Sequence, residues 1–343
     1  MTKTPAGHSE ADPASRPRRV TASDVAKQAG VSRSAVSRAF DPNAYLDRHK
    51  REIILKTAVK LGYRPNALAA SLQGMRSNLV GVIIGDMTNQ YDAEFAAMLL
   101  SRLNAANKWP LLVGGSMPVT EEAIMAVLGY PLDAMIVRGG SLAAHLFDDC
   151  AKLNIPLIFS GRIVDAPFAD CVCCRNAEGT AQAVDLLLRS GHKGLGYIGG
   201  PGTWSSDRER LSGVTSTLAQ NGLSLVGQVQ SDFSYEGGAQ AAASLLADDR
   251  VDGLICANDA MALGALSYVR NHTSKTVPDD VAIVGFDDVS LASWPDFNLT
   301  TVRNPLGTMI DEVLRLLEAR LADPMRLSET VMINPILKER GTH

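Results

Sequence analysis

The stretch Val20–Phe40, VTASDVAKQAGVSRSAVSRAF, predicts two short helices joined by a tight turn. Thr21 is suited to cap the start of the first helix, and Asp24 places an acidic side chain in its first turn. Gly30 permits the positive φ of such a turn, and Ser32 is suited to cap the second helix. This pattern is typical of a helix-turn-helix, in which small and branched side chains fill the helix crossing; here they are Val25, Ala26, Ala29, Val31 and Val36.

The second helix begins with polar side chains that can face solvent. Arginine can bind guanine through two hydrogen bonds in the major groove, and serine hydroxyls and helix-start amides suit phosphate. An α-helical hairpin without a nucleic-acid role is the alternative. We expect DNA contacts from Arg33, Ser34, Ser37 and Arg38. A third helix is predicted from Asp47 to Leu61, with a buried stripe of Ile53, Ile54, Ala58 and Leu61.

The charge of the chain is unevenly distributed around this motif. All 343 residues together carry a net charge of −4, which by itself argues against a polyanion partner. Residues 1–76, however, hold 14 Lys and Arg against 6 Asp and Glu, a net charge of +8, and the remainder carries −12. A solvated helical face would explain basic residues alone. Because the basic part is also the part with the helix-turn-helix, the asymmetry favours DNA binding.

Composition excludes several classes of protein. Hydrophobic residues make up 46% and charged residues 20%, which is ordinary for a soluble globular chain. No apolar run approaches the roughly 18 residues that span a bilayer, so no membrane partner is expected. Residues 1–18 are polar and are expected to form a disordered tail rather than a signal peptide. The five cysteines lack metal-ligand spacing, and we expect a cytoplasmic protein associated with the nucleoid, with no metal and no cofactor.

From Leu79 onward, short apolar runs alternate with helical patterns. Such alternation implies parallel sheets with right-handed crossovers. A length of about 265 residues is best divided into two doubly wound halves with a ligand in the cleft between them. The predicted strands are 79–85, 111–114, 134–137, 156–160, 195–198, 253–257 and 281–286, with a further strand around Cys171, Cys173 and Cys174. The predicted helices are 93–106, 121–128, 142–153, 178–189, 208–221, 236–246 and 260–270.

The segment Gly194–Gly199 matches the G-x-G-x-x-G pattern of dinucleotide-binding folds. In that fold the glycines follow a strand and open a helix, whereas here Leu195, Tyr197 and Ile198 themselves have the pattern of a strand. The chain also lacks a G-x-S-x-G elbow, an H-E-x-x-H motif and a P-loop. The sequence therefore argues against an enzyme.

Several motifs together resemble the lactose-repressor (LacI/GalR) family of bacterial transcription regulators. They are the helix-turn-helix, LGYRPN at Leu61–Asn66, LAASL at Leu68–Leu72, Gly191–Pro201, ANDAMALG at Ala257–Gly264 and VGFDD at Val284–Asp288. The resemblance covers nearly all of the chain from Val20. It implies an all-α helix-turn-helix headpiece over 19–65, a hinge over 66–76, and an effector-binding and dimerisation domain over 77–343. That domain would consist of two doubly wound α/β subdomains like those of a periplasmic sugar-binding protein.

The resemblance also implies how the hinge binds DNA. The hinge would fold into a short helix on DNA, pair with a second hinge in a dimer, and insert Leu72 into the minor groove. An ordinary packing role is the alternative for Leu72. Ala35 and Asp41 depart from the usual Thr and Asn, which weakens two expected polar contacts. The residues expected at DNA are Thr21, Ser32, Arg33, Ser34, Ser37, Arg38, Tyr63, Asn66, Ala69 and Leu72.

The loops after the predicted strands are the expected position of an effector, because open α/β sheets bind ligands there. They include Asn89–Asp92, Gly161–Arg162 and Trp204–Arg210. By resemblance, Arg210 and Asn258 contact the ligand, Asp287 binds its hydroxyls or amines, and Phe233 and Tyr91 stack on it. Asp259 and Asp288 are expected to cap helices or turns. The expected effector-binding residues are Asp86, Tyr91, Asp92, Arg162, Ser206, Arg210, Phe233, Asn258 and Asp287.

Two departures from the family pattern bear on the effector. Asp92 stands where many relatives have an aromatic residue, and Arg175 where many have an acidic one. We expect several arginines to converge on the cleft and hypothesise an anionic effector, such as a sugar acid or sugar phosphate. Pairing of some arginines with nearby acids is the alternative, and Arg208 could equally form a surface ion pair. The converging set is Arg138, Arg162, Arg175 and Arg210.

The expected function is that of a homodimeric transcriptional regulator, most often a repressor in this family. Each headpiece would bind half of a pseudopalindromic operator, and an effector would change the angle between the two subdomains. No leucine heptad follows Ile336, which argues against tetramers by that route. A transport-type solute-binding protein is one rival, opposed by residues 20–74 and the lack of a signal peptide. A nucleotide-cofactor enzyme is the other, opposed by the misplaced glycines.

Overall fold

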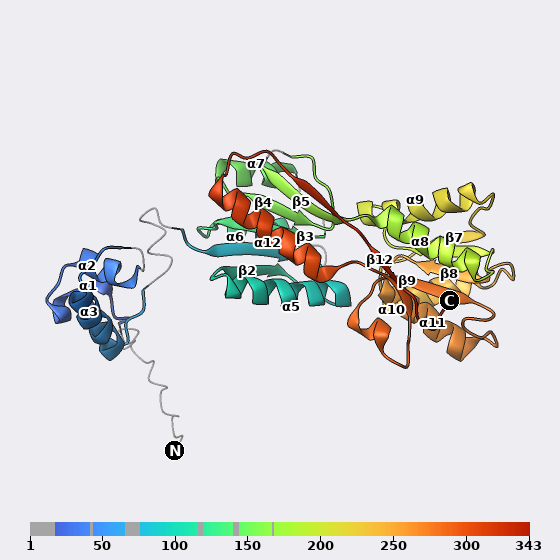
Figure 1. Ribbon diagram of the computed structural model, residues 1–343, viewed down its shortest axis with the longest axis horizontal. Helices are drawn as coiled ribbons and strands as arrows, with labels where there is room; N and C mark the ends of the chain where they lie inside the picture. The colour runs from blue at the N-terminus through green and yellow to red at the C-terminus, as the bar shows by residue number, and fades with distance from the viewer. Residues whose placement is uncertain (1–17, 42–43, 66–75, 116–118, 140–143, 167) are drawn as a thin grey trace, which may run out of the picture. The chain divides into compact units, whose positions relative to one another are not determined.

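The computed structural model describes residues 18–41, 44–65, 76–115, 119–139, 144–166 and 168–343 (Figure 1). The chain divides into two compact units, Met1–Ser77 and Asn78–His343, which we call the headpiece and the body. None of the described helices combines the length and the apolar composition needed to cross a membrane.

The headpiece contains three helices, α1 (Ala22–Ala29), α2 (Arg33–Phe40) and α3 (Arg48–Leu61). Thr21 and Asp24 form a capping box at the start of α1: the Thr21 amide donates to the Asp24 carboxylate at 2.9 Å, and the Asp24 amide donates to the Thr21 hydroxyl at 3.4 Å. Gly30 ends α1 with a φ of 66°. These local signals place the two helices as the sequence predicts.

A small apolar core holds the three headpiece helices together. Val25, Val36 and Ile54 are fully buried, and four alanines complete the contact surface: Ala26, Ala35, Ala39 and Ala58. The prediction that Ile53 belongs to the buried stripe is wrong, since its side chain is 40% exposed. At about 100° per residue, only one of two consecutive isoleucines can face the core of a thin three-helix unit, and that residue is Ile54.

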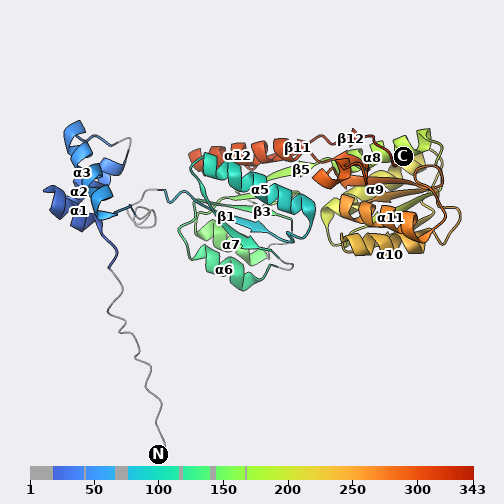
Figure 2. The same ribbon diagram turned by 90° about the horizontal axis from the view of Figure 1, so that it is seen from below.

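The first subdomain of the body has a six-stranded, wholly parallel sheet in the order β11-β5-β4-β3-β1-β2. Helices α5 and α12 cover one face of the sheet, and α6 and α7 cover the other (Figure 2). The strands are β1 (Leu79–Ile84), β2 (Trp109–Gly114), β3 (Ala134–Arg138), β4 (Leu157–Ser160), β5 (Ala169–Cys174) and β11 (Thr330–Ile333). The helices are α5 (Gln90–Ala105), α6 (Glu121–Leu128), α7 (Ala144–Lys152) and α12 (Leu306–Ala322).

The second subdomain has a sheet in the order β12-β10-β9-β8-β6-β7, which is parallel except for the antiparallel pair β10–β12. Helices α8 and α9 lie on one face, and α10 and α11 on the other (Figures 1 and 2). The strands are β6 (Leu195–Gly199), β7 (Gly227–Gln230), β8 (Gly253–Cys256), β9 (Ala282–Asp287), β10 (Thr300–Arg303) and β12 (Ile336–Lys338). The helices are α8 (Asn176–Arg189), α9 (Ser205–Gln220), α10 (Tyr235–Leu245) and α11 (Asp259–His272), with a 3₁₀ turn at Ser290–Ser293.

The chain passes between the two subdomains three times: from β5 to α8, from β10 to α12, and from β11 to β12. The predicted fold class, a helix-turn-helix followed in the chain by two doubly wound parallel-sheet subdomains, is confirmed. The antiparallel β12 is a correction to it. The late elements β10, α12, β11 and β12, and the edge strand β7, are not among the sequence-predicted elements.

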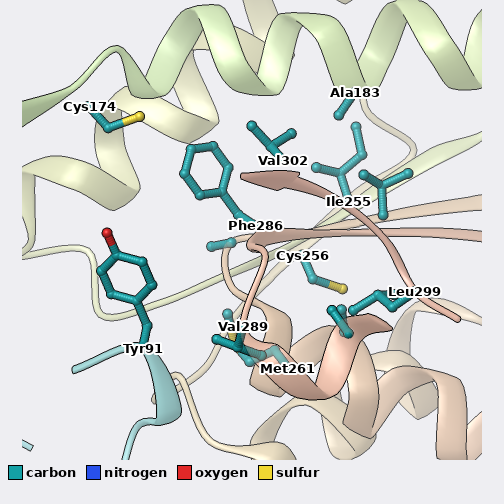
Figure 3. Packing of buried hydrophobic residues seen from close by; sticks show 14 of the residues in the cluster. Tyr91, Cys174, Ala183, Ile255, Cys256, Met261, Phe286, Val289, Leu299 and Val302 are labelled. Atoms are coloured by element: carbon teal, nitrogen blue, oxygen red, sulfur yellow. The ribbon is translucent and has the colours of Figure 1, made fainter. Parts of the chain in front are cut away.

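One hydrophobic cluster extends through both subdomains. It includes Phe286 and Val302 of the second subdomain together with Tyr91 of the first. Figure 3 shows Phe286 packed under the helix that carries Ala183, with Tyr91 and Cys174 on the same side of the cluster. Because this core is continuous, the cavity described below lies between two subdomains that already share packed side chains.

Candidate functional site

The outer face of α2 is a polar, exposed surface. Its opposite face carries Ala35, Val36 and Ala39 into the headpiece core. The Ser32 hydroxyl caps the helix by accepting the Ala35 amide at 3.2 Å. The side chains that remain exposed are Ser32, Arg33, Ser34, Ser37 and Arg38, five of the ten residues predicted at DNA.

Arg33 and Arg38 give this face its charge. Within the described residues, neither guanidinium forms an ion pair with a carboxylate. Arg38 Nε donates only to the Ser34 carbonyl, at 3.4 Å. Two unneutralised guanidinium groups on one exposed helix face can bind phosphates or the acceptor edges of guanine.

Of the other five residues predicted to contact DNA, two are half-buried in the headpiece and three lie outside the described residues. Thr21 is half-buried in the capping box. Tyr63 is half-buried, with its ring 5.7 Å from that of Phe40 in an edge-on contact, and burial raises the pKa of its phenol. The positive charge of Arg33 favours the ionised phenolate and so opposes this rise in the pKa of Tyr63. Three predicted residues lie outside the described part of the chain: Asn66, Ala69 and Leu72.

The body contains a cavity of about 250 Å³ at the carboxyl ends of the two sheets. Strands β3, β4 and β5 of the first subdomain end at it, and so do β6 and β10 of the second. Its charged lining residues are Asp92, Arg138, Arg162, Arg208 and Arg210, and its uncharged polar lining residues include Asn176, Thr203, Ser205, Ser206 and Asn304. A concave, polar site between two subdomains is where α/β proteins of this type bind ligands.

Arg138 and Asp92 form a shielded ion pair on the wall of the first subdomain. Arg138 Nε donates to Asp92 Oδ1 at 2.9 Å, and the two side chains are 11% and 13% exposed. The guanidinium also lies over the Tyr91 ring, 4.9 Å from its centroid. Gly161 leaves room for it, because a Cβ there would lie 2.1 Å from Arg138 Nη1. Asp92 therefore holds an arginine in the wall.

Arg210 is anchored by partners on all three nitrogens. Nε donates to the side-chain oxygen of Asn176 at 3.0 Å, Nη1 donates to the Ala257 carbonyl, and Nη2 lies 3.5 Å from Asp287 Oδ1. Its guanidinium stacks over the ring of Phe286, 3.7 Å from the centroid. Arg210 thus has a fixed position in the cavity wall, and its charge is partly balanced by a carboxylate.

Asp287 is buried behind Arg210 at the end of β9. Burial raises the pKa of its carboxyl to about 6, although Arg210 and Arg138 act in the opposite direction. A carboxyl with this pKa changes its charge close to neutral pH, beside an arginine that lines the cavity.

Asp287→Asn should change how the free energy of unfolding depends on pH. The native carboxyl holds its proton more tightly than the unfolded one, because its pKa is raised from 3.8 to about 6. The ionised form therefore opposes folding above about pH 6, and this cost disappears as pH falls toward 4. Relative to the variant, the wild type should lose about 1 kcal/mol of stability between pH 5 and pH 7. Urea unfolding at both pH values measures this, and identical pH slopes for the two proteins would contradict it.

Among the described residues, Trp204 is the aromatic side chain that lines the cavity. It lies in a predicted ligand loop but is not one of the predicted effector residues. Phe233 meets the Trp204 ring edge-on at 5.5 Å and does not itself line the cavity. Asn258 donates to the Phe233 carbonyl at 3.0 Å and accepts the Met261 amide at 2.9 Å. Phe233 and Asn258 therefore support the loops behind the wall.

The predicted effector residues thus divide into two groups. Four of the predicted residues line the cavity: Asp92, Arg162, Ser206 and Arg210. Five do not: Asp86, Tyr91, Phe233, Asn258 and Asp287. Of these five, Asp86 accepts hydrogen bonds from the amide and hydroxyl of Thr88, and Tyr91 is buried with its hydroxyl 3.5 Å from the Asn304 carbonyl.

Three of the four arginines expected to converge do line the cavity, and Arg175 does not. Arg175 pairs with Glu178 at 3.1 Å on the outer surface of α8. The fourth arginine that lines the cavity is Arg208, whose Nη1 donates to the carbonyls of Gly202 and Thr203.

Asp288 does not cap a helix or turn as expected, whereas Asp259 accepts the backbone amide of Val289, which precedes the 3₁₀ turn Ser290–Ser293. Asn258 caps α11, and Asp259 is fully buried, accepting the Val289 amide at 2.8 Å and the Thr301 hydroxyl at 2.5 Å. Asp288 instead forms ion pairs at 2.6 Å with two arginines, Arg303 and Arg340.

Both units of the chain match models of known protein families. The model of the bacterial regulatory proteins of the lacI family matches residues 21–66, and that of the periplasmic binding protein-like domain matches residues 184–343. The HTH-type transcriptional regulator CelR of Thermobifida fusca is 30% identical over 333 residues, which are 91% of this chain and 96% of that protein. The chain belongs to the lacI family of bacterial regulatory proteins.

Further similarities agree with this assignment. The HTH-type transcriptional regulator GalS of Salmonella typhimurium is 29% identical over 94% of this chain and 96% of its own length. The crystal structure of the Lac repressor dimer bound to operator and the anti-inducer ONPF has a TM-score of 0.84 at 25% identity, covering 95% of this chain and 99% of that one. The predicted family and its function are confirmed: this lacI-family chain is a DNA-binding transcriptional regulator.

Proposed function

We propose that this lacI-family regulator is a repressor that binds pseudopalindromic operator DNA as a homodimer in the cytoplasm. A small polar molecule in the cavity would set its operator affinity. The observation that carries the DNA part is the outer face of α2, where Arg33 and Arg38 are exposed and form no ion pair within the described residues. In a helix-turn-helix the second helix enters the major groove, so these are the side chains that would meet base edges and phosphates.

Regulation by a ligand is supported by the composition of the cavity wall. Both subdomains contribute to it, so a ligand that contacts both changes the free energy of one subdomain arrangement relative to another. A polar contact between the subdomains lies nearby: Glu94 Oε1 accepts the Ser290 amide at 3.1 Å, and the Gln90 side chain donates to the Ser290 hydroxyl at 3.1 Å. A change in subdomain angle would break or make these bonds. No reaction is needed for this role, and we propose no enzymatic activity.

Two solved relatives support the proposed pairing of DNA and effector. One is described as the transcriptional regulator CelR-cellobiose complex, with a TM-score of 0.69 at 26% identity. The other is the Lac repressor dimer on its operator. The cellobiose of the first supports a sugar-like effector for this chain, and the dimer of the second supports a dimer.

In vitro selection from random DNA duplexes by the full-length protein tests this proposal and identifies the operator in the same experiment. The selected duplexes should share a motif with two-fold symmetry, because a symmetric dimer presents two identical recognition helices. Binding to that motif should weaken steeply with salt, whereas a duplex with the motif scrambled should bind far less tightly. Selection of duplexes that share no motif would contradict the proposed function.

A further inference from the structure

The cavity wall has an excess of positive charge. Four arginines line it, and Asp92 is its one lining carboxylate among the described residues. Asp92 is committed to Arg138 at 2.9 Å, and Asp287, behind the wall, is paired with Arg210. These two arginines are therefore balanced by carboxylates of the protein itself.

Arg208 and Arg162 contribute further positive charge to the wall. Arg208 is exposed and forms no ion pair with any carboxylate in the described part of the chain; its Nη1 donates to the carbonyls of Gly202 and Thr203. Arg162 is partly buried, with its guanidinium 5.3 Å from the centroid of the Phe159 ring. A cation that is partly removed from water gains more from a bound anion than a fully hydrated one does.

The start of α9 offers backbone amides to an anion. Asp207 in the same first turn is buried and accepts the Tyr197 hydroxyl and the Gly200 amide, and its carboxylate offsets part of the helix dipole. The helix begins at Ser205 after Trp204, whose side chain makes no capping hydrogen bond, and Ser205 and Ser206 both line the cavity. The first amide groups of a helix lack intrahelical partners and, with the helix dipole, favour negative charge. Arg208 lies in the first turn of the same helix, so its guanidinium and the first backbone amides of α9 can bind the same anion.

Asn304 provides an independent indication of where a ligand would bind. Its side chain is 4% exposed and lines the cavity beyond β10. The side-chain oxygen of Asn304 is the single buried side-chain polar atom without a hydrogen-bond partner among the residues described. Buried acceptors are normally satisfied, so an unpaired one at a cavity wall indicates a donor that arrives from outside the chain. A ligand hydroxyl is such a donor.

We propose that the effector is an anionic polyhydroxy molecule whose carboxylate or phosphate binds Arg162, Arg208 and the start of α9, while one of its hydroxyls donates to Asn304. This inference rests on the proposed function, because it names the chemical class of the ligand that the cavity binds. Carboxylate and phosphate share the same chemistry here, since both accept several hydrogen bonds from guanidinium and amide donors.

A neutral sugar would satisfy this site less well. It could donate to Asn304, but it would leave Arg208 without an anion while covering the guanidinium from water. Binding of such a ligand would carry the desolvation cost of a cation without a compensating charge. The charge of the wall therefore favours the acid form of a sugar over the sugar itself.

Isothermal titration calorimetry of the full-length protein tests the charge preference. The titrants are inorganic phosphate, and glucose, galactose and mannose, each with its uronate and its 6-phosphate, all at constant ionic strength. Phosphate should bind saturably at one site, and an acid or phosphate form should bind more tightly than its parent hexose. The uronate and 6-phosphate series distinguish the two sources of negative charge.

Variants locate the bound anion. Arg208→Met and Arg162→Met should each weaken anion binding by about 10- to 100-fold, the loss expected for a hydrogen bond to a charged group. Arg208→Lys, which keeps the charge, should retain more affinity than Arg208→Met, a difference that a merely structural role would not produce. Arg250→Met is the matched control, because Arg250 is exposed and pairs with Asp248 away from the cavity. Thermal unfolding of each variant verifies that it is folded.

The outcomes separate this inference from the proposed function. Absence of phosphate binding, or equal binding by all the variants, would overturn the inference, as would tighter binding of a neutral hexose than of its acid forms. A neutral hexose that also changes operator affinity would leave the proposed function standing. A ligand that fills the cavity without changing operator affinity would contradict the proposed function instead.

Discussion

Arg320→Met should lower the free energy of unfolding of the body by about 3–5 kcal/mol. Arg320, in α12, and Asp170, in β5, both have side chains that are 0% exposed. Arg320 donates from Nε to Asp170 Oδ2 at 2.9 Å and from Nη2 to Asp170 Oδ1 at 2.8 Å. Methionine would fill much of the same volume, but the buried carboxylate of Asp170 would keep, among the described residues, only Arg326, at 3.2 Å from its Oδ1, as a charged partner. The loss of the two hydrogen bonds from Arg320 to this buried charge is the costly part of the substitution.

Urea unfolding measures this loss, and two further proteins make its cause testable. Arg315→Met is the matched control, because Arg315 lies in the same helix and is 46% exposed. It pairs at the surface with Glu312 of that helix and with Glu329, which precedes β11. That variant should lose less than about 1 kcal/mol. The double variant Arg320→Met/Asp170→Leu should recover most of the loss, since it removes both buried charges. A double variant as unstable as the single one would show that the buried carboxylate deprived of Arg320 is not the cause.

Arg38→Ala should weaken operator binding by about 5- to 150-fold, which corresponds to about 1–3 kcal/mol for one base or phosphate contact. Combined with Arg33→Ala, the loss should be larger, because both side chains occupy the exposed face of α2. Neither substitution removes an ion pair within the described residues or a buried contact, so headpiece stability should change little. Fluorescence anisotropy with the selected operator measures the change.

Lys56→Ala provides the control for charge alone. Lys56 is 76% exposed on α3 and pairs with Glu52 at 2.7 Å, so its removal deletes one positive charge away from the α2 face. It should change operator affinity far less than Arg38→Ala does. Ligand binding in the cavity should be unchanged in both variants. If Arg38→Ala lost ligand affinity as well, the assignment of the two functions to two separate units would be wrong.

The headpiece was predictable from sequence because its determinants are local. The cap at Thr21, the positive φ at Gly30 and the cap at Ser32 lie within a dozen residues of each other, and each is formed as predicted. Ile53 was misplaced because periodicity alone cannot decide which of two adjacent isoleucines faces a core that other helices define.

The end of the body was not predictable in the same way. Strands β11 and β12 are four and three residues long, and they join different sheets across a passage between subdomains. The burial of β10 includes Thr300 and Thr301, whose polar side chains conceal an apolar pattern. Membership of these segments in a sheet depends on neighbours far away in sequence, which a local pattern does not contain.

The cavity shows the same limit. The rule that ligands bind after the carboxyl ends of strands identified the correct loops, and Arg162 and Arg210 line the wall as that rule suggests. It could not determine which way each loop side chain points, so Phe233 and Asp287 lie behind the wall while Trp204 and Asn304 line it. Asn304 follows a strand that the pattern did not reveal, and its unpaired oxygen is visible only in three dimensions.

The central claim is that occupancy of the cavity sets operator affinity. It is tested most directly by anisotropy titrations of the selected operator with and without a saturating cavity ligand, paired with ligand titrations with and without operator. We predict that the ligand changes operator affinity by about 5- to 150-fold, and that the operator changes ligand affinity by the same factor, because the coupling is reciprocal. Saturation of the cavity with no change in operator affinity would contradict the claim.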